Sequence, residues 1–80
     1  MPGAAGRAYV VFTINGRTVE SDLTPAVEDM MFLVRQLEPN LPNATANELR
    51  ESAITRAADA VIRAHQREGN VGAWYIRRTQ

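Results

Sequence analysis

Residues 45–68 read TANELRESAITRAADAVIRAHQRE, and their pattern predicts one long helix. Thr45 and Glu48 have the spacing of a capping box, in which each side chain accepts a hydrogen bond from a free backbone amide at the helix start. Gly69 follows as a residue that can adopt the left-handed conformation past a helix end. At 1.5 Å per residue such a helix is roughly 35 Å long, so the rest of a small domain must pack against it.

The whole chain has 80 residues and no cysteine. This length supports one domain, with residues 1–7, MPGAAGR, as a flexible leader and residues 8–80 as a single small domain. A core of this size is marginal without disulfides, and small domains often gain the missing stability by self-association. We therefore expect a homodimer.

The charge of the chain is balanced, with nine basic residues, all of them Arg, and nine acidic ones. A neutral chain must gather its Arg residues on one face in order to bind DNA. No apolar run is long enough to span a membrane, and the N-terminus lacks the apolar segment of a secretory signal. We expect a cytoplasmic protein without a membrane partner. The absence of Lys and the abundance of Ala favour a GC-rich coding sequence of bacterial or phage origin.

A β-hairpin is predicted around Asn15-Gly16, because this dipeptide separates two strand-like runs, AYVVFTI and RTVESDL. A two-residue turn would pair Ile14 with Arg17, Phe12 with Val19, Val10 with Ser21 and Ala8 with Leu23. The alternation of side chains then gives one apolar face and one mostly polar face. The apolar face carries Ala8, Val10, Phe12, Ile14, Val19 and Leu23, and the polar face carries Tyr9, Val11, Thr13, Thr18, Glu20 and Asp22.

A first helix is predicted from Thr24 to Glu38, with Thr24 as its N-cap, Pro25 in its first turn and Pro39 after its end. Its middle, MMFLV at residues 30–34, has more consecutive apolar residues than one helix face can hold. Two interpretations stay open. The helix is covered by the core on several sides, or Met30, Met31 and Phe32 meet a second subunit.

The long helix carries an apolar arc and, on its far side, three Arg residues. The arc consists of Leu49, Ala53, Ile54, Ala57, Ala58, Val61, Ile62 and Ala64, and the far side carries Arg56, Arg63 and Arg67. Asp59 lies four residues before Arg63 and is expected to pair with it. The tail, NVGAWYIRRTQ, reads as a third strand, with Trp74 and Ile76 on one face and Tyr75 and Arg77 on the other.

These segments predict an α+β fold in the order β-β-α-α-β. A three-stranded antiparallel sheet, with the last strand beside the first and both helices on its apolar face, satisfies all the patterns.

Side chains suited to catalysis are scarce. The only histidine, His65, lies near the middle of the apolar arc, where a lone histidine usually serves packing. The sequence has no cysteine nucleophile, no Gly-rich phosphate loop and no spacing of ligands typical of a metal site. We expect no enzymatic activity, no cofactor and no metal.

Residues 17–68 resemble the ribbon-helix-helix repressors. A strand leads into Thr24-Pro25 and a helix, and TANELRESAI is similar to the start of the second helix of that family. The resemblance implies a strand that enters the major groove and a phosphate held by Thr45, Ala46 and Asn47. The DNA contacts would be Arg17, Thr45, Asn47, Arg56, Arg63 and Arg67. Glu20 and Asp22 on the strand would repel phosphate, which makes this the second interpretation.

The preferred interpretation is a small non-catalytic protein-interaction module that forms a homodimer. The alternative is an Arc-like DNA-binding regulator. In the preferred interpretation, Met30, Met31 and Phe32 form the dimer interface. Aromatic and Arg side chains are common anchors of protein interfaces, so the contacts to an unknown protein partner are predicted at Tyr9, Thr18, Glu20, Tyr75 and Arg77.

Overall fold

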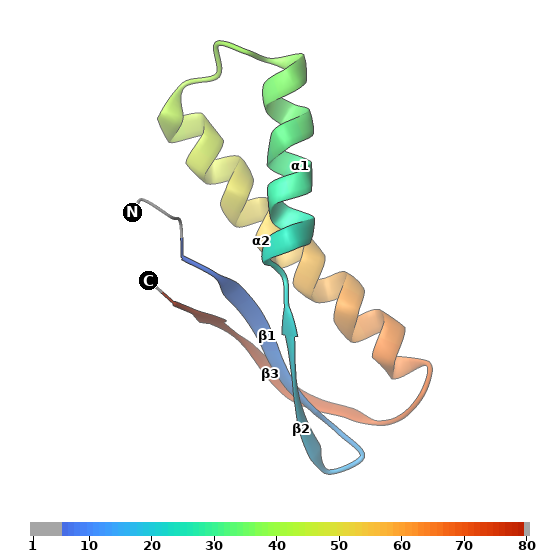
Figure 1. The fold of residues 1–80 in the computed structure, drawn as a ribbon. Coiled ribbons are helices and arrows are strands. Elements are labelled where there is room, and N and C mark those ends of the chain that lie inside the picture. Colours follow the sequence, from blue (N-terminus) through green and yellow to red (C-terminus); the bar gives the residue numbers. More distant parts are fainter. Residues whose placement is uncertain (1–5, 80) are drawn as a thin grey trace.

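The computed structural model describes residues 6–79 and has the predicted α+β fold in the order β-β-α-α-β (Figure 1). Residues 1–5 of the expected leader lie outside this description. The antiparallel sheet has the strand order β2-β1-β3. The elements are β1 (Ala8–Ile14), β2 (Arg17–Asp22), α1 (Thr24–Leu37), α2 (Asn43–Gln66) and β3 (Val71–Arg78).

The hairpin has the predicted turn and register. Asn15 and Gly16 have φ values of 51° and 79°, which is the left-handed region that a tight two-residue turn requires. Ile14 pairs with Arg17 and Phe12 with Val19, as the sequence predicted. The turn also holds the start of β3, because the Asn15 amide donates to the Asn70 carbonyl at 3.1 Å and the Asn15 Oδ1 accepts the Asn70 amide at 3.2 Å.

The third strand lies beside the first, which confirms the predicted topology. Trp74 pairs with Phe12 and Ile76 with Val10, so both belong to the apolar face of the sheet. A bulge interrupts this pairing, and a side chain at Gly72 would overlap Thr13. Arg7, expected to be part of the leader, extends the sheet, because its carbonyl accepts the Thr79 amide at 2.9 Å.

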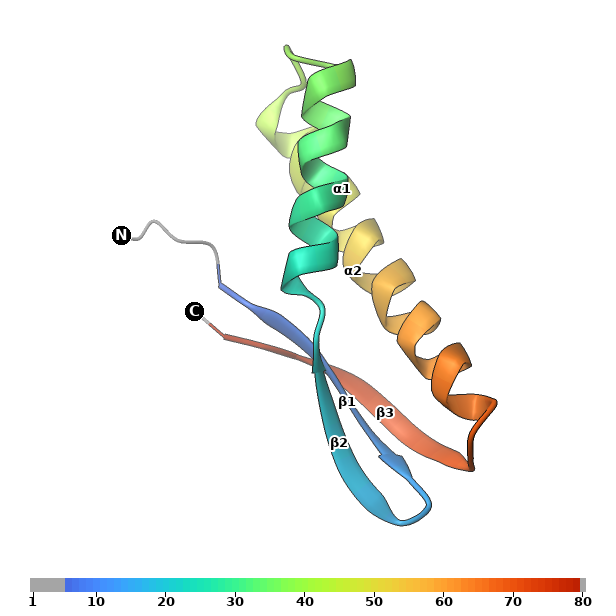
Figure 2. The same cartoon turned by 45° about the vertical axis from the view of Figure 1, so that its right-hand side comes forward.

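The two helices are arranged differently from the prediction. We expected both on the apolar face of the sheet, but α2 lies along that face, whereas α1 adds Val27 and Met31 to the same core and leads away from the strands to pack on α2 (Figures 1 and 2). The physical reason is the connection between β2 and α1, which is only Leu23. One residue is too short for a loop that folds a helix back over the strand it follows.

The predicted caps are wrong at both helix starts. The long helix begins at Asn43 instead of Thr45, with Pro42 as N-cap, and no side chain caps it, so Thr45 and Glu48 form no capping box. Pro42 holds its extended conformation by its own ring, and its carbonyl accepts the Ala46 amide at 2.9 Å. In α1 the N-cap is Leu23, because the Thr24 hydroxyl instead accepts the Ala8 amide at 3.0 Å.

The helix ends deviate less. The long helix ends at Gln66, two residues before the expected Glu68, and the His65 carbonyl accepts the Glu68 and Gly69 amides there. The first helix ends at Leu37, one residue early.

The core lies between α2 and the sheet and continues under the first turns of α1. Val10, Phe12 and Leu23 are its largest fully buried side chains. Ala53 and Ala58 are completely covered, which shows that small residues let α2 approach its neighbours closely. The molecule is elongated, with extents of 45 × 26 × 16 Å, because α1 and the first half of α2 project beyond the sheet (Figure 2).

Candidate functional site

Four of the seven large apolar side chains that are exposed in residues 6–79 belong to the first helix. The predicted interface residues divide between core and surface: Met31 is 2% exposed and packs in the core, whereas Met30 and Phe32 are 40% and 63% exposed. Met30 and Phe32 are about 200° apart around the helix, at roughly 100° per residue, so they belong to different sides of α1. That Met30 and Phe32 contact a second subunit stays a prediction. Met31 contributes to the stability of the subunit itself.

Two further exposed side chains share the side of Met30 and were missed from sequence. Leu33 and Leu37 are 61% and 79% exposed, and the exposed Ala26 precedes them. These residues are spaced by four, three and four positions, so they form one line along α1. We call the four residues Ala26, Met30, Leu33 and Leu37 the α1 stripe. Their spacing was the available signal, and the continuous apolar run at residues 30–34 concealed it.

A groove between the helices extends the stripe toward α2. Met30 and Val34 line it from α1, and Leu49 and Arg56 line it from α2. Leu49 is itself 39% exposed. The apolar surface of the helical hairpin therefore includes side chains of both helices.

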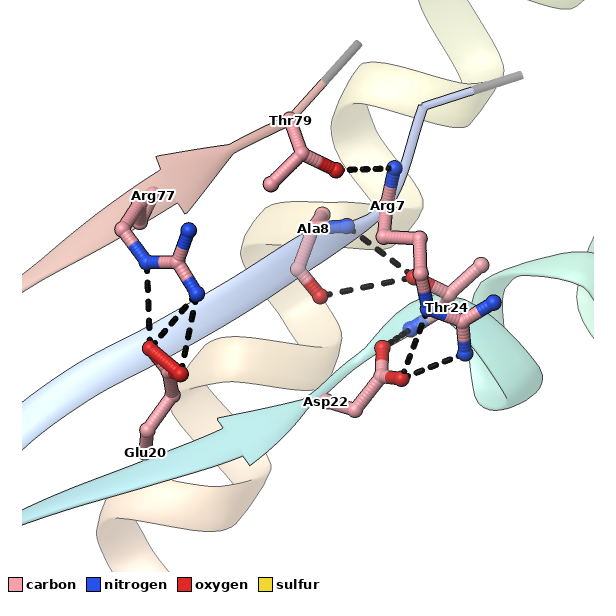
Figure 3. Close-up of polar contacts among 7 residues, drawn as sticks. All are labelled: Arg7, Ala8, Glu20, Asp22, Thr24, Arg77 and Thr79. Atoms are coloured by element: carbon pink, nitrogen blue, oxygen red, sulfur yellow. Dashed lines mark hydrogen bonds and ion pairs between the residues drawn. The ribbon is translucent and has the colours of Figure 1, made fainter. Parts of the chain in front are cut away.

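The outer face of the sheet, opposite α2, gathers the predicted partner contacts, of which Figure 3 shows Glu20 and Arg77. The Arg77 guanidinium donates to both carboxylate oxygens of Glu20, at 2.7 and 2.9 Å, and its carbon lies 4.4 Å above the centre of the Tyr9 ring. The hydrogen bonds that Arg77 donates to the Glu20 carboxylate raise the pKa of Arg77. The strand register places Tyr75 and Thr18 on the same face. All five predicted contacts thus share one surface, which we call the outer sheet face.

A second ion pair fixes the end of β2 at the start of α1 (Figure 3). The Arg7 guanidinium bonds Asp22 Oδ2, and Asp22 Oδ1 accepts the Thr24 amide at 2.9 Å. These bonds favour the charged carboxylate, so they lower the pKa of Asp22, with the Arg7 hydrogen bond as the largest cause. The same contact raises the pKa of Arg7.

The residues predicted to contact DNA lie far apart. The hairpin turn before Arg17 and the connection before Thr45 and Asn47 lie at opposite ends of the molecule (Figures 1 and 2). Along α2, Thr45 and Arg63 are separated by about 27 Å at 1.5 Å per residue. Arg63 forms the predicted ion pair with Asp59, at 2.8 Å. Arg56 and Arg67 are exposed on the same helix and at its end. One subunit therefore does not bring this set together.

A small cavity of about 170 Å³ lies where the ends of β1 and β3 meet the helices. It is smaller than the roughly 300–1,000 Å³ of ordinary ligand pockets. Arg50 and Arg78 line it, and each pairs with a carboxylate at 2.7 Å, Arg50 with Glu28 and Arg78 with Glu51. The ion pairs satisfy these charges within the subunit.

His65 serves packing. Its ring lies 4.8 Å from the Phe12 ring, centre to centre, and its Nδ1 lies 2.9 Å from the Val61 carbonyl oxygen. Within residues 6–79 no three His, Cys, Asp or Glu side chains gather into a potential metal site. In the same part of the chain, neither helix is long and apolar enough to cross a bilayer. Comparison with known protein families, curated proteins and solved structures finds no match to this chain.

Acid should weaken the fold through Asp22. The pKa of Asp22 is lower in the folded chain, so its contribution to stability is present above its ordinary pKa of about 3.9 and is lost as the pH falls through the folded value. We expect Asp22→Asn to flatten the decrease in the free energy of unfolding below about pH 4, measured by urea denaturation at several pH values. Glu68→Gln, at an exposed position beyond α2, is the control. If Asp22→Asn left the acid dependence as steep as in the unchanged chain, the Arg7–Asp22 contact would not stabilise the fold.

Proposed function

We propose that this chain is a small non-catalytic protein-interaction module that works as a homodimer. The observation that carries the proposal is the α1 stripe, because Leu33 and Leu37 are mostly exposed on a helix that only α2 supports. Large contiguous apolar surfaces on soluble domains commonly mark sites of association. The proposal places the molecule in the cytoplasm, and the composition of the chain suggests that its gene is of bacterial or phage origin.

The shape of the subunit supports association. Its Cα radius of gyration is 14.2 Å, whereas a compact domain of 80 residues has about 12 Å. The difference comes from the projecting helical hairpin, which exposes apolar side chains on both of its sides. A second chain against this hairpin would complete a core that one chain leaves open.

The energy available is sufficient to matter. Burying a Leu or Met side chain completely is worth about 1.5–3 kcal/mol relative to leaving it exposed. The stripe offers Met30, Leu33 and Leu37 from each subunit, and Leu49 borders it. Partial burial of these side chains in a symmetric dimer would contribute several kcal/mol before the cost of association, which is comparable with the marginal stability expected of so small a core.

The outer sheet face is the proposed surface for a protein partner. It carries Tyr9, Arg77 and the exposed Tyr75, which are the residue types most frequent among binding hot spots. It lies on the side of the sheet that α2 does not cover, and α1 projects beyond the sheet (Figure 1). Dimerisation through the helices would therefore leave it accessible.

A charge in the stripe should separate the subunits without unfolding them. In Leu37→Glu, each dimer would lose two buried Leu side chains and place two carboxylates in an apolar interface. We expect the dissociation constant to rise at least about a hundredfold, measured by sedimentation velocity. Because Leu37 is 79% exposed in the subunit, the subunit's own unfolding free energy should change by only about 0.5 kcal/mol.

Ala60→Glu is the matched control, since Ala60 is exposed on the half of α2 beyond α1. It should leave the dissociation constant unchanged. If both variants dissociated equally, or neither did, the stripe would not be the interface.

Duplex DNA distinguishes this proposal from the ribbon-helix-helix alternative. Because the net charge is zero and the candidate DNA contacts are dispersed, we expect no binding at low salt with tens of micromolar protein, measured by fluorescence anisotropy. Binding that weakens steeply with added salt, and that is lost in Arg63→Gln or Arg56→Gln, would instead favour the DNA-binding regulator.

A further inference from the structure

We propose that the second copy lays its α1 antiparallel along the first, with Met30 of each chain opposite Leu33 of the other. The inference rests on the proposed homodimer and specifies which residues meet in it. The occupant of the α1 stripe is thus the same stripe on a second chain, related by a twofold axis.

The spacing of the stripe determines the register. In an antiparallel pair the two chains run in opposite directions, so the residue numbers of any two residues that meet add up to the same value. One register pairs every member of the stripe with another member: Ala26 meets Leu37 and Met30 meets Leu33, each pair occurring twice. In this register the small Ala26 side chain leaves room for the larger Leu37 side chain of the other chain. Met30 and Leu33, which are similar in size, meet in the middle of the seam. The four, three and four spacing is that of a helix pair with a narrow apolar seam.

Charge favours the same arrangement. The stripe contains no charged side chain, and the charged Glu28 and Arg35 lie on the opposite side of α1, where Glu28 pairs with Arg50. Asp29 and Gln36 flank the seam. In the antiparallel register the Asp29 carboxylate comes near the Gln36 amide of the second chain, a neutral donor, and the two Asp29 carboxylates lie apart. No like charges face one another across the seam.

The position of the sheet favours the antiparallel over the parallel arrangement. Because α1 begins one residue after β2, a parallel pair of α1 helices would bring both sheets to the same end of the seam. Each α2 also crosses α1 near that end (Figures 1 and 2), so a parallel pair would gather both sheets and both crossings in the same region. The antiparallel pair places the sheets at opposite ends and leaves both outer sheet faces free.

Disulfide trapping tests this register, and the chain is suited to it because it has no cysteine of its own. Two single-cysteine variants, Met30→Cys and Leu33→Cys, are mixed at a concentration where light scattering shows each to be a dimer. They are then equilibrated in a buffer of reduced and oxidised glutathione. We expect the mixed disulfide, which joins one chain of each variant, to form at least about ten times more than the disulfide of an Arg35→Cys variant with itself. The reason is that a dimer holds the matched pair at high effective concentration.

Arg35→Cys is the matched control, since it lies on α1 at an exposed position outside the stripe. Dimers in which the mixed disulfide forms no more than the control disulfide would overturn this register and leave the proposed homodimer intact. If the cysteine variants stayed monomeric while the unchanged chain is dimeric, the stripe would be supported as the interface. If Phe32→Cys formed a disulfide with itself as efficiently as the matched pair forms the mixed one, the stripe would not be the interface. A monomeric unchanged chain would overturn the proposed function itself.

Discussion

One residue, Leu23, connects β2 to α1, and this short connection determines the shape of the subunit. It prevents α1 from folding back over the sheet, so α1 extends away from the strands. Leu23 is buried, and its amide bonds the Ala8 carbonyl at 2.8 Å. Asp22, which precedes Leu23 in the chain, accepts hydrogen bonds from the Arg7 guanidinium and from the Thr24 amide. The direction of α1, and with it the exposure of the stripe, follows from these contacts around one residue.

The long helix serves two packing roles because its 24 residues extend beyond the end of the sheet. Its second half covers the sheet through Ala58 and Ile62, and its first half supports α1 through Ala46 and Ala53. Since α1 touches little else, only the side of α1 that faces α2 is buried, at Val27 and Met31. The chain therefore has its buried core at the sheet and under one side of α1, whereas Leu33 and Leu37 stay exposed on α1.

Local sequence signals predicted the sheet well, because Asn15-Gly16 permits one turn geometry and side-chain alternation then assigns each face. The structure then shows Tyr9, Glu20 and Arg77 in contact on one face, whereas the alternation within each strand had left the hairpin and the third strand as separate surfaces. The helical half was less predictable. Both the capping box at Thr45 and the proline at Pro42 are signals for a helix start. The folded structure shows that the helix starts after Pro42. The five apolar residues from Met30 concealed which of them face α2. The candidate DNA contacts are dispersed because α2 separates Thr45 from Arg63 and the sheet places Arg17 at the far end of the molecule. Grouping these residues by type in the sequence did not take these distances into account.

The most direct test of this account is the molar mass of the unchanged chain in solution, measured by light scattering over a range of concentrations. The uncovered stripe predicts twice the 8.9 kDa of one chain, with dissociation only on strong dilution. A mass of 8.9 kDa at every concentration would contradict it, because the exposed Leu33 and Leu37 would then be tolerated without a second copy.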